Sequence, residues 1–196
     1  MQVATDLRSH FVHGVCFVSL APLSDAALVT STIAQELGCR GPTEIPFGDQ
    51  VKRYLQDKDF LLILDNFEHL VSAATLVEEI LLTCPDVTIL VTSRAVLHVR
   101  GEQEYPVPPL ALPHLNQIAE SNNLSTYAAI NLFLHRARAV SPTFEMTADN
   151  RRTIAKICIR LDGLPLSIEL AEARVKALPS QELFARLSQR LLVLSG

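Results

Sequence analysis

Two short, strongly apolar runs lie in the middle of the chain, at residues 60–64 (Phe-Leu-Leu-Ile-Leu) and 87–91 (Val-Thr-Ile-Leu-Val). Runs of this length and composition are typical of strands buried on both faces of a parallel sheet. Over residues 68–84, between them, apolar side chains recur at helical spacing: Leu70, Ala73, Ala74, Val77, Ile80 and Leu81. The pattern therefore predicts a crossover in which a helix connects two parallel strands.

The chain before this crossover alternates between the same two patterns. Residues 1–11 carry a helical apolar stripe, and residues 15–20 have the β-branched and aromatic composition of a strand. Ser24 or Asp25 is expected to cap a following helix, which Gly38 ends. A loop rich in Gly and Pro over residues 38–46 and a short helix over residues 50–56 then lead into the strand at 60–64.

The second half of the chain has a different character. Prolines in residues 104–110 confine this extended piece to a strand edge or to the periphery. The polar residues 113–124 are typical of a linker, and helical apolar stripes follow at 125–140, 147–161 and 165–177, with a fourth, shorter helix after Pro179. The sequence therefore predicts an α/β domain over residues 1–112, a linker over 113–124 and an all-helical domain over 125–196.

Polar residues directly follow both central strands: Asp65 and Asn66 after the first, and Thr92, Ser93 and Arg94 after the second. Open parallel sheets bind their ligands outside the carboxyl ends of the strands. An acid there can hold Mg²⁺, usually through water, and a guanidinium can meet a terminal phosphate. The alternative is that Asp65 and Arg94 are ordinary polar strand ends, which are common in α/β proteins.

Composition excludes several other classes of function. The 196 residues are 48% apolar and 19% charged, which is typical of a globular protein with one domain or two small ones. A net charge of -4 provides no basic surface for nucleic acid or an anionic membrane. The four cysteines are widely spaced and form no zinc or disulfide pattern, which indicates a reducing compartment. Because the sequence has no signal-peptide pattern and no membrane span, we expect a cytoplasmic protein.

Four segments of the chain, in order, resemble one protein family. They are residues 62–70 (Leu-Ile-Leu-Asp-Asn-Phe-Glu-His-Leu), 91–94 (Val-Thr-Ser-Arg), 102–110, and 161–170 (Leu-Asp-Gly-Leu-Pro-Leu-Ser-Ile-Glu-Leu). Together they resemble the NB-ARC type of STAND signal-transduction ATPase, which occurs in large bacterial transcriptional regulators of the LuxR and SARP kind. The resemblance covers nearly all of the chain, and four ordered motifs are far more specific than any one of them.

The resemblance implies roles for the residues at the strand ends. Asp65 matches the Walker B acid that orients Mg²⁺, and Asn66 stands where many relatives have a second acid. Arg94 matches the sensor that reads the terminal phosphate of the nucleotide. With Asn at position 66, Glu68 is a candidate general base for water. An acid in a first helical turn is also explained by the helix dipole, so a structural role for Glu68 stays open.

The resemblance also implies a nucleotide contact in the helical domain. Gly163, Leu164 and Pro165 match a Gly-Leu-Pro turn whose proline packs near the nucleotide base. Gly163 would allow the tight entry that this turn needs, and proline is favoured in the first turn of a helix. The alternative for these three residues is a plain helix start.

One part of the family pattern is missing from this sequence. The family begins with a strand and a phosphate-binding Gly-x-x-x-x-Gly-Lys-Ser/Thr loop, and none of the seven glycines here is followed by Lys and Ser or Thr. The chain therefore resembles a parallel-sheet P-loop NTPase core without its first strand. In the family this strand lies inside the sheet, so we expect well-paired strands at 15–20, 60–64 and 87–91, and a segment 104–108 that pairs poorly or not beside them.

Two functions follow from these features. The first is a switch in which ADP keeps the two domains closed and exchange for ATP with Mg²⁺ opens them, so that other domains of a parent regulator respond. The second is a non-catalytic protein-interaction module without nucleotide binding, which the missing phosphate loop favours for these residues alone. A full ATP-hydrolysing enzyme needs both the loop and a second acid, so we expect at most a slow ATPase.

Overall fold

The computed structural model describes residues 2–42, 44–114, 118, 124–172, 182, 184 and 185. The chain divides into two compact units, Met1–Tyr105 and Pro106–Gly196, and each unit has a hydrophobic core. We name them the sheet unit and the helical unit. The predicted domain limits at residues 112 and 125 remain predictions, because most of residues 113–124 lie outside the described part of the chain.

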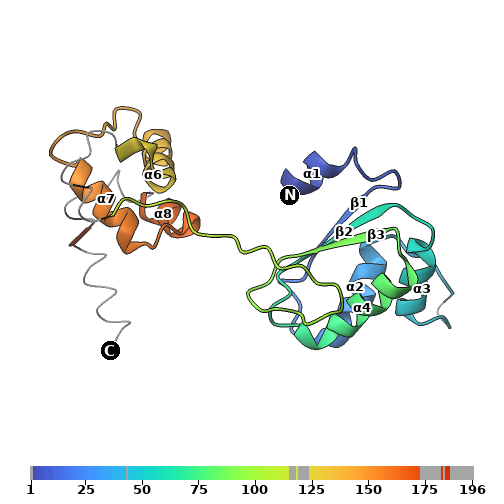
Figure 1. Cartoon of the computed structure of the whole chain (residues 1–196). Coiled ribbons are helices and arrows are strands. Elements are labelled where there is room, and N and C mark those ends of the chain that lie inside the picture. Colours follow the sequence, from blue (N-terminus) through green and yellow to red (C-terminus); the bar gives the residue numbers. More distant parts are fainter. Residues whose placement is uncertain are drawn as a thin grey trace. The chain divides into compact units, whose positions relative to one another are not determined.

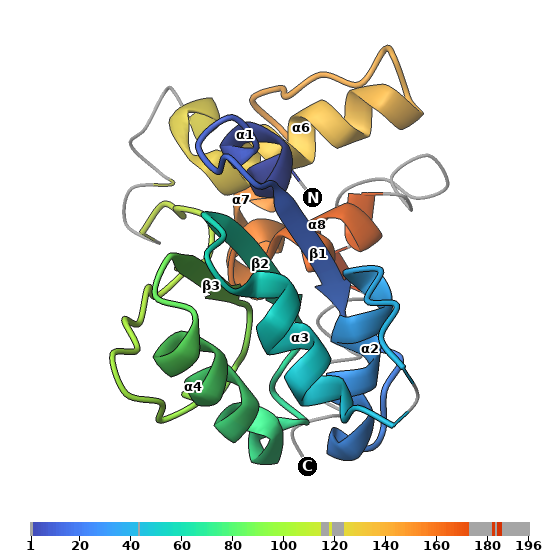
Figure 2. The same ribbon diagram turned by 90° about the vertical axis from the view of Figure 1, so that its right-hand side faces the viewer.

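Three parallel strands form the sheet: β1 (Val15–Ser19), β2 (Phe60–Asp65) and β3 (Val87–Val91), in the order β1-β2-β3. Figure 2 shows them side by side. The carboxyl ends of the strands lie at one edge, because Leu64 pairs with Val18 on one side and with Val91 on the other. Residues 60–64 of the central strand are buried, as an interior strand requires. The predicted α/β class and the three parallel strands are confirmed.

Helices α2 (Val29–Glu36), α3 (Phe47–Leu55) and α4 (Ala74–Thr83) cover one face of this sheet (Figure 1). Helix α2 packs against β1 and α3, and α4 packs against β3 and α3. Short 3-10 turns precede α2 at Ala26–Leu28 and α4 at Val71–Ala73. The N-terminal helix α1 (Gln2–Leu7) contacts β1.

The core of the sheet unit lies between the sheet and these three helices. Leu62 and Leu64 of β2 are fully buried in one cluster with side chains from each helix: Ile33, Val51 and Ile80. Full burial of a large aliphatic side chain contributes about 1.5–3 kcal/mol. This packing therefore supplies much of the stability of the unit. It also fixes the position of Asp65, the last residue of β2.

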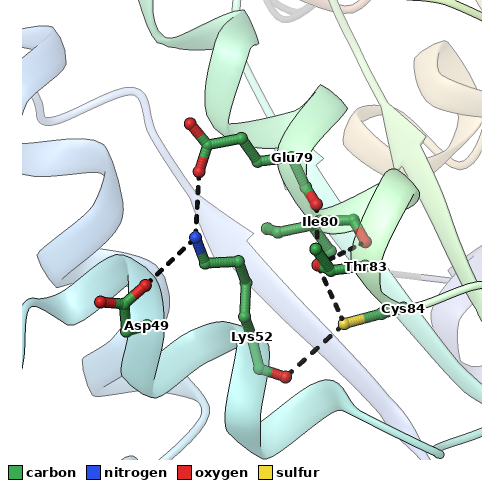
Figure 3. A network of polar contacts seen from close by, with 6 residues as sticks. All are labelled: Asp49, Lys52, Glu79, Ile80, Thr83 and Cys84. Atoms are coloured by element: carbon green, nitrogen blue, oxygen red, sulfur yellow. Dashed lines mark hydrogen bonds and ion pairs between the residues drawn. The ribbon is translucent and has the colours of Figure 1, made fainter.

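A polar network joins α3 to α4 (Figure 3). Lys52 Nζ lies 3.1 Å from Asp49 Oδ1, one turn earlier on α3, and 3.1 Å from Glu79 Oε2 on α4. The hydrogen bond to Glu79, and after it the bond to Asp49, raises the pKa of Lys52 above its ordinary value of 10.5. The Cys84 thiol donates to the Lys52 carbonyl oxygen at 3.5 Å. These contacts connect α3 to α4 on the face of the sheet that the helices cover.

Several element limits differ from the predictions. The helix predicted from residue 68 starts only at the 3-10 turn Val71–Ala73, because Phe67 is fully buried and its N–H bonds to the Thr92 carbonyl at 2.9 Å. Glu68 therefore lies in a loop and not in a first helical turn. The first helix ends at Leu7, and the helix predicted at 50–56 begins at Phe47, where the Pro46 carbonyl accepts the first helical bonds.

Two further expectations concern caps and the fourth strand. Asp25 and not Ser24 caps the turn before α2, because its Oδ1 accepts the Ala27 N–H at 2.9 Å. Residues 104–108 are described and form no strand, in agreement with the expectation that this segment pairs poorly or not beside the others.

The helical unit contains α6 (Ala128–Val140), α7 (Arg151–Arg160) and α8 (Pro165–Glu172), with a 3-10 turn at Leu124–Thr126. Its core is apolar and includes fully buried residues of all three helices: Phe133, Ile154, Cys158 and Ile168. Helix α7 starts at Arg151, later than predicted, and follows a turn in which the Thr147 N–H donates to Asn150 Oδ1 and the Asn150 N–H donates to Thr147 Oγ1. The predicted extension of α8 to residue 177 lies outside the described residues, and of the predicted fourth helix only Glu182, Phe184 and Ala185 are described, all three in helical conformation. Throughout the described part of the chain, every helix is too short or too polar to cross a membrane.

Candidate functional site

The carboxyl ends of β2 and β3 are joined by the residue that follows β3, Thr92. Its hydroxyl donates a hydrogen bond to Asp65 Oδ1 at 2.6 Å and accepts one from the backbone N–H of Asn66 at 3.0 Å. Its backbone N–H donates to the Leu64 carbonyl at 3.0 Å, and its carbonyl accepts from the Phe67 N–H at 2.9 Å. The two strand ends are thus connected by both the main chain and the side chain of one residue.

Asn66 turns the chain sharply at the end of β2. Its φ of 64° lies in the left-handed region, where Asn is tolerated better than most other residues that carry a side chain. The turn directs Phe67 into the core, where it is fully buried. The amide of Asn66 carries no charge, so the negative charge of these two positions resides on Asp65.

Arg94 and Glu68 approach each other at the same edge of the sheet. Arg94 Nε lies 3.7 Å from Glu68 Oε1, and the two side chains are 91% and 26% exposed. An ion pair with so exposed a partner contributes little to stability. The guanidinium therefore remains accessible to an anion from solvent. The turn that carries it is shaped by the Ser93 hydroxyl, which bonds to the backbone N–H and carbonyl of Ala95 at 3.0 and 2.6 Å.

The acidic groups at this edge suit a metal ion that brings ligands of its own. Within the described residues, no group of three or more His, Cys, Asp or Glu side chains is arranged to hold a metal. Mg²⁺, however, is often bound by one or two carboxylates together with water and the phosphates of a substrate. Asp65 fits this second arrangement, with one carboxylate oxygen fixed by Thr92.

The Gly-Leu-Pro turn of the helical unit is determined by close packing. Gly163 has a φ of 66°, and a Cβ at this position would lie 2.4 Å from the Leu110 carbonyl oxygen. The Leu110 N–H in turn donates to the Gly163 carbonyl at 3.0 Å. Leu164 is 47% exposed, and Pro165 is the first residue of α8. Only glycine fits here without displacing residues 110–112.

The structure thus brings together some of the predicted site residues directly. Glu68 faces Arg94, and Asp65 and Asn66 share Thr92 as a partner. Gly163, Leu164 and Pro165 form a turn of their own in the helical unit. The catalytic and nucleotide-binding roles implied for these residues stay predictions.

Sequence reasoning assigned no role to two residues that shape this edge. Thr92 could have been found from its place directly after a central strand, because polar residues at neighbouring strand ends share an edge. Glu102 accepts the backbone N–H groups of Leu97 and Val99 at 3.0 and 3.3 Å, which orders the loop after Arg94. No local pattern in the sequence indicated this second contact.

Several mycobacterial proteins are similar in sequence to the chain. No family model matches it. A protein of Mycobacterium tuberculosis (strain ATCC 25618 / H37Rv) named "Putative HTH-type transcriptional regulator" is 36% identical over 194 residues, which make up 98% of this chain and 20% of that protein. A protein of the same name in Mycobacterium bovis has the same identity and coverage. An uncharacterized protein of M. tuberculosis is 34% identical over 197 residues, 100% of this chain and 47% of that protein. The chain therefore spans between a fifth and about half of the length of these relatives.

Proposed function

We propose that this chain is a nucleotide-responsive module of a larger transcriptional regulator, of the NB-ARC type of STAND ATPase with a P-loop NTPase-like sheet. The nucleotide is ADP or ATP with Mg²⁺. The observation that carries the proposal is the convergence of Asp65, Thr92 and the pair formed by Glu68 and Arg94 at the carboxyl ends of two parallel strands. Similarity over nearly the whole chain to proteins named as transcriptional regulators supports the regulatory role.

Each residue has a defined task in this proposal. Asp65 holds the Mg²⁺ ion, which neutralises the charge of the nucleotide phosphates. Arg94 is 91% exposed and offers its planar donor group to the terminal phosphate. When it does so, Glu68 loses its partner and becomes available to orient water. Because Asn66 stands in place of a second acid, we expect hydrolysis to be slow at most. Asn66 supplies the turn that positions these groups.

The helical unit carries a separate, uncharged candidate for contact with a nucleotide. The turn formed by Gly163, Leu164 and Pro165 offers backbone and apolar groups, which suit the flat face of a nucleotide base. As part of a transcriptional regulator the module acts in the cytoplasm, and its partners are the nucleotide and the other domains of that regulator. It contacts neither nucleic acid nor a membrane directly.

Isothermal titration calorimetry of the purified chain with ADP and with ATP, each with Mg²⁺, tests the proposal. We expect Asp65→Ala to weaken binding about tenfold or more, because a charged ligand of the ion is lost. Asp86→Ala is the matched control, since this exposed acid precedes β3 at the opposite end of the strand. Equal affinity in Asp65→Ala and wild type, or no heat from a folded wild type, would contradict nucleotide binding at this edge.

A second candidate is a protein-interaction module that binds no nucleotide. It is favoured by the apolar side chains exposed on and before α8, since Leu164, Leu166 and Leu170 are 47%, 67% and 64% exposed. Grouped apolar side chains at a surface are typical of a docking face. This alternative predicts that the folded wild-type chain gives no binding heat with either nucleotide.

A further inference from the structure

Thr92 is the most connected polar residue at the carboxyl ends of β2 and β3, and its hydroxyl has a defined direction. The hydroxyl carries a single proton. Because the Asn66 N–H donates to its oxygen at 3.0 Å, this oxygen acts there as an acceptor, and the proton is directed to Asp65 Oδ1 at 2.6 Å. A distance this short is typical of a hydroxyl bound to an ionised carboxylate.

The main chain around Asp65 is held mainly by backbone hydrogen bonds, to which this hydroxyl adds one, from the Asn66 N–H. The Asp65 carbonyl accepts the Leu20 N–H at 2.9 Å, from the side of β1. On the side of β3, the backbone of Thr92 bonds to Leu64 and to Phe67. Besides its bond to the Asn66 N–H, the Thr92 hydroxyl therefore adds control over the side chain of Asp65, whose carboxylate would otherwise rotate at a partly exposed strand end.

We propose that Thr92 is a positioning residue, which fixes the Asp65 carboxylate in the orientation that binds Mg²⁺ together with the nucleotide phosphates. The inference rests on the proposed function of this edge. A ligand held in its binding orientation loses less conformational entropy when the ion arrives, so the affinity for the metal complex rises. Thr92 acts through Asp65 and contacts neither the nucleotide nor the ion.

A Thr92 hydroxyl with a purely structural role would give a different result. It would hold β2 and β3 together, so its loss would reduce stability and weaken nucleotide binding equally with and without metal. A positioning role acts only on the metal-dependent part of the affinity. The difference between affinities measured in Mg²⁺ and in EDTA therefore separates the two roles.

The test compares Thr92→Val with Thr92→Ser by calorimetry, using ADP in Mg²⁺ and in EDTA. Valine keeps the β-branched shape and the hydrogen bonds of the residue's own backbone but loses the hydroxyl, including its bond to the Asn66 N–H, whereas serine keeps the hydroxyl. In Thr92→Val the gain in affinity from Mg²⁺ should fall roughly three- to tenfold, with the affinity in EDTA unchanged. Thr92→Ser should restore the gain, and Thr92→Val should have no further effect in the Asp65→Ala background.

Each other outcome overturns a specific statement. A full Mg²⁺-dependent gain in Thr92→Val overturns the positioning role and leaves the proposed function intact. An equal loss in Mg²⁺ and in EDTA also overturns it, in favour of a purely structural role. Absence of binding by folded wild-type protein overturns the proposed function, and the role of Thr92 with it. If circular dichroism shows that Thr92→Val is unfolded, Thr92→Ala takes its place under the same criteria, because it adds no bulk between the strands.

Discussion

The sheet unit and the helical unit present their candidate residues in different ways. In the sheet unit, polar side chains meet because parallel strands end at one edge, and bonds of 2.6 and 3.0 Å to Thr92 hold Asp65 and Asn66 there. In the helical unit, Gly163 and Pro165 carry no charge, and their turn is fixed by packing against Leu110. The candidate residues of the sheet unit therefore depend on donor and acceptor geometry, and those of the helical unit depend on steric fit. Different substitutions should break them.

The largest effect is expected from Gly163→Ala, which tests the steric fit of the turn in the helical unit. The new methyl group would lie 2.4 Å from the Leu110 carbonyl oxygen, at a φ of 66° that alanine disfavours. We expect a loss of about 2–4 kcal/mol in the free energy of unfolding, measured by urea titration with circular dichroism. Gly101→Ala is the control, because its φ is 83° but the space around it is open. It should cost about 1 kcal/mol, and equal losses would show that packing does not determine the Gly163 turn.

The next largest effect concerns the turn at the end of β2. Asn66→Ala places a less tolerant residue at a φ of 64°, so we expect the free energy of unfolding to fall by about 1 kcal/mol. Asn66→Gly relieves the same backbone and should change stability by only a few tenths of a kcal/mol. Urea titration of both variants checks this pair. A greater loss with glycine than with alanine would mean that the Asn66 side chain, and not its backbone, stabilises the turn.

A smaller effect is expected from Lys52→Met, which tests whether the polar contacts between α3 and α4 contribute to the stability of the sheet unit. Its partners are 52% and 57% exposed, so we expect a loss of about 0.5 kcal/mol at neutral pH. Because the pKa of Lys52 is raised above 10.5 in the folded state, its contribution is complete below 10.5 and is lost as the pH rises through the folded value. Urea titrations of both proteins at neutral pH and above that value should therefore show the difference disappearing. A difference that persists would assign it to packing of the lysine stem.

The smallest change in stability is expected from Glu68→Gln. The pair with Arg94 spans 3.7 Å and is largely exposed, so its loss should alter the free energy of unfolding by less than about 0.5 kcal/mol. The effect on binding should be larger than that on stability. If the pair restrains Arg94, its release should raise the affinity for ATP with Mg²⁺ about twofold in calorimetry at low salt. A lower affinity would indicate that Glu68 itself supports the bound nucleotide.

Much of the secondary structure of the sheet unit could be predicted, because it depends on residues close together in the sequence. The apolar runs at 60–64 and 87–91 end in polar residues, and parallel pairing alone places Asp65 and Arg94 at one edge. The start of α4 could not be predicted in this way. Apolar spacing extends the helix back to residue 68, but the buried Phe67 and its bond to Thr92 keep Glu68 in a loop.

The other features that the sequence did not predict depend on contacts between residues far apart in sequence. The contact between Thr92 and Asp65 requires the register that sets Leu64 beside Val91. Residues 60–64 are all buried, so this strand has no apolar and polar alternation that would specify the register. The need for glycine at position 163 arises from Leu110, in a segment that the sequence assigned to a strand edge or to the periphery. Such contacts are visible only when the chain is folded.

The strands β1, β2 and β3 neighbour one another in the order in which they occur in the chain. During synthesis, each new strand can therefore dock on the edge left by the one before it, with no rearrangement of those already paired. The bond from Thr92 to Asp65 forms only when β3 has docked. An intermediate with β1 and β2 paired would have buried apolar surface but a freely rotating Asp65 carboxylate. Under the proposed function, the orientation of Asp65 that binds Mg²⁺ would therefore be reached in the last step of sheet assembly, and pulse-labelled hydrogen exchange should find the amides of β3 protected after those of β2.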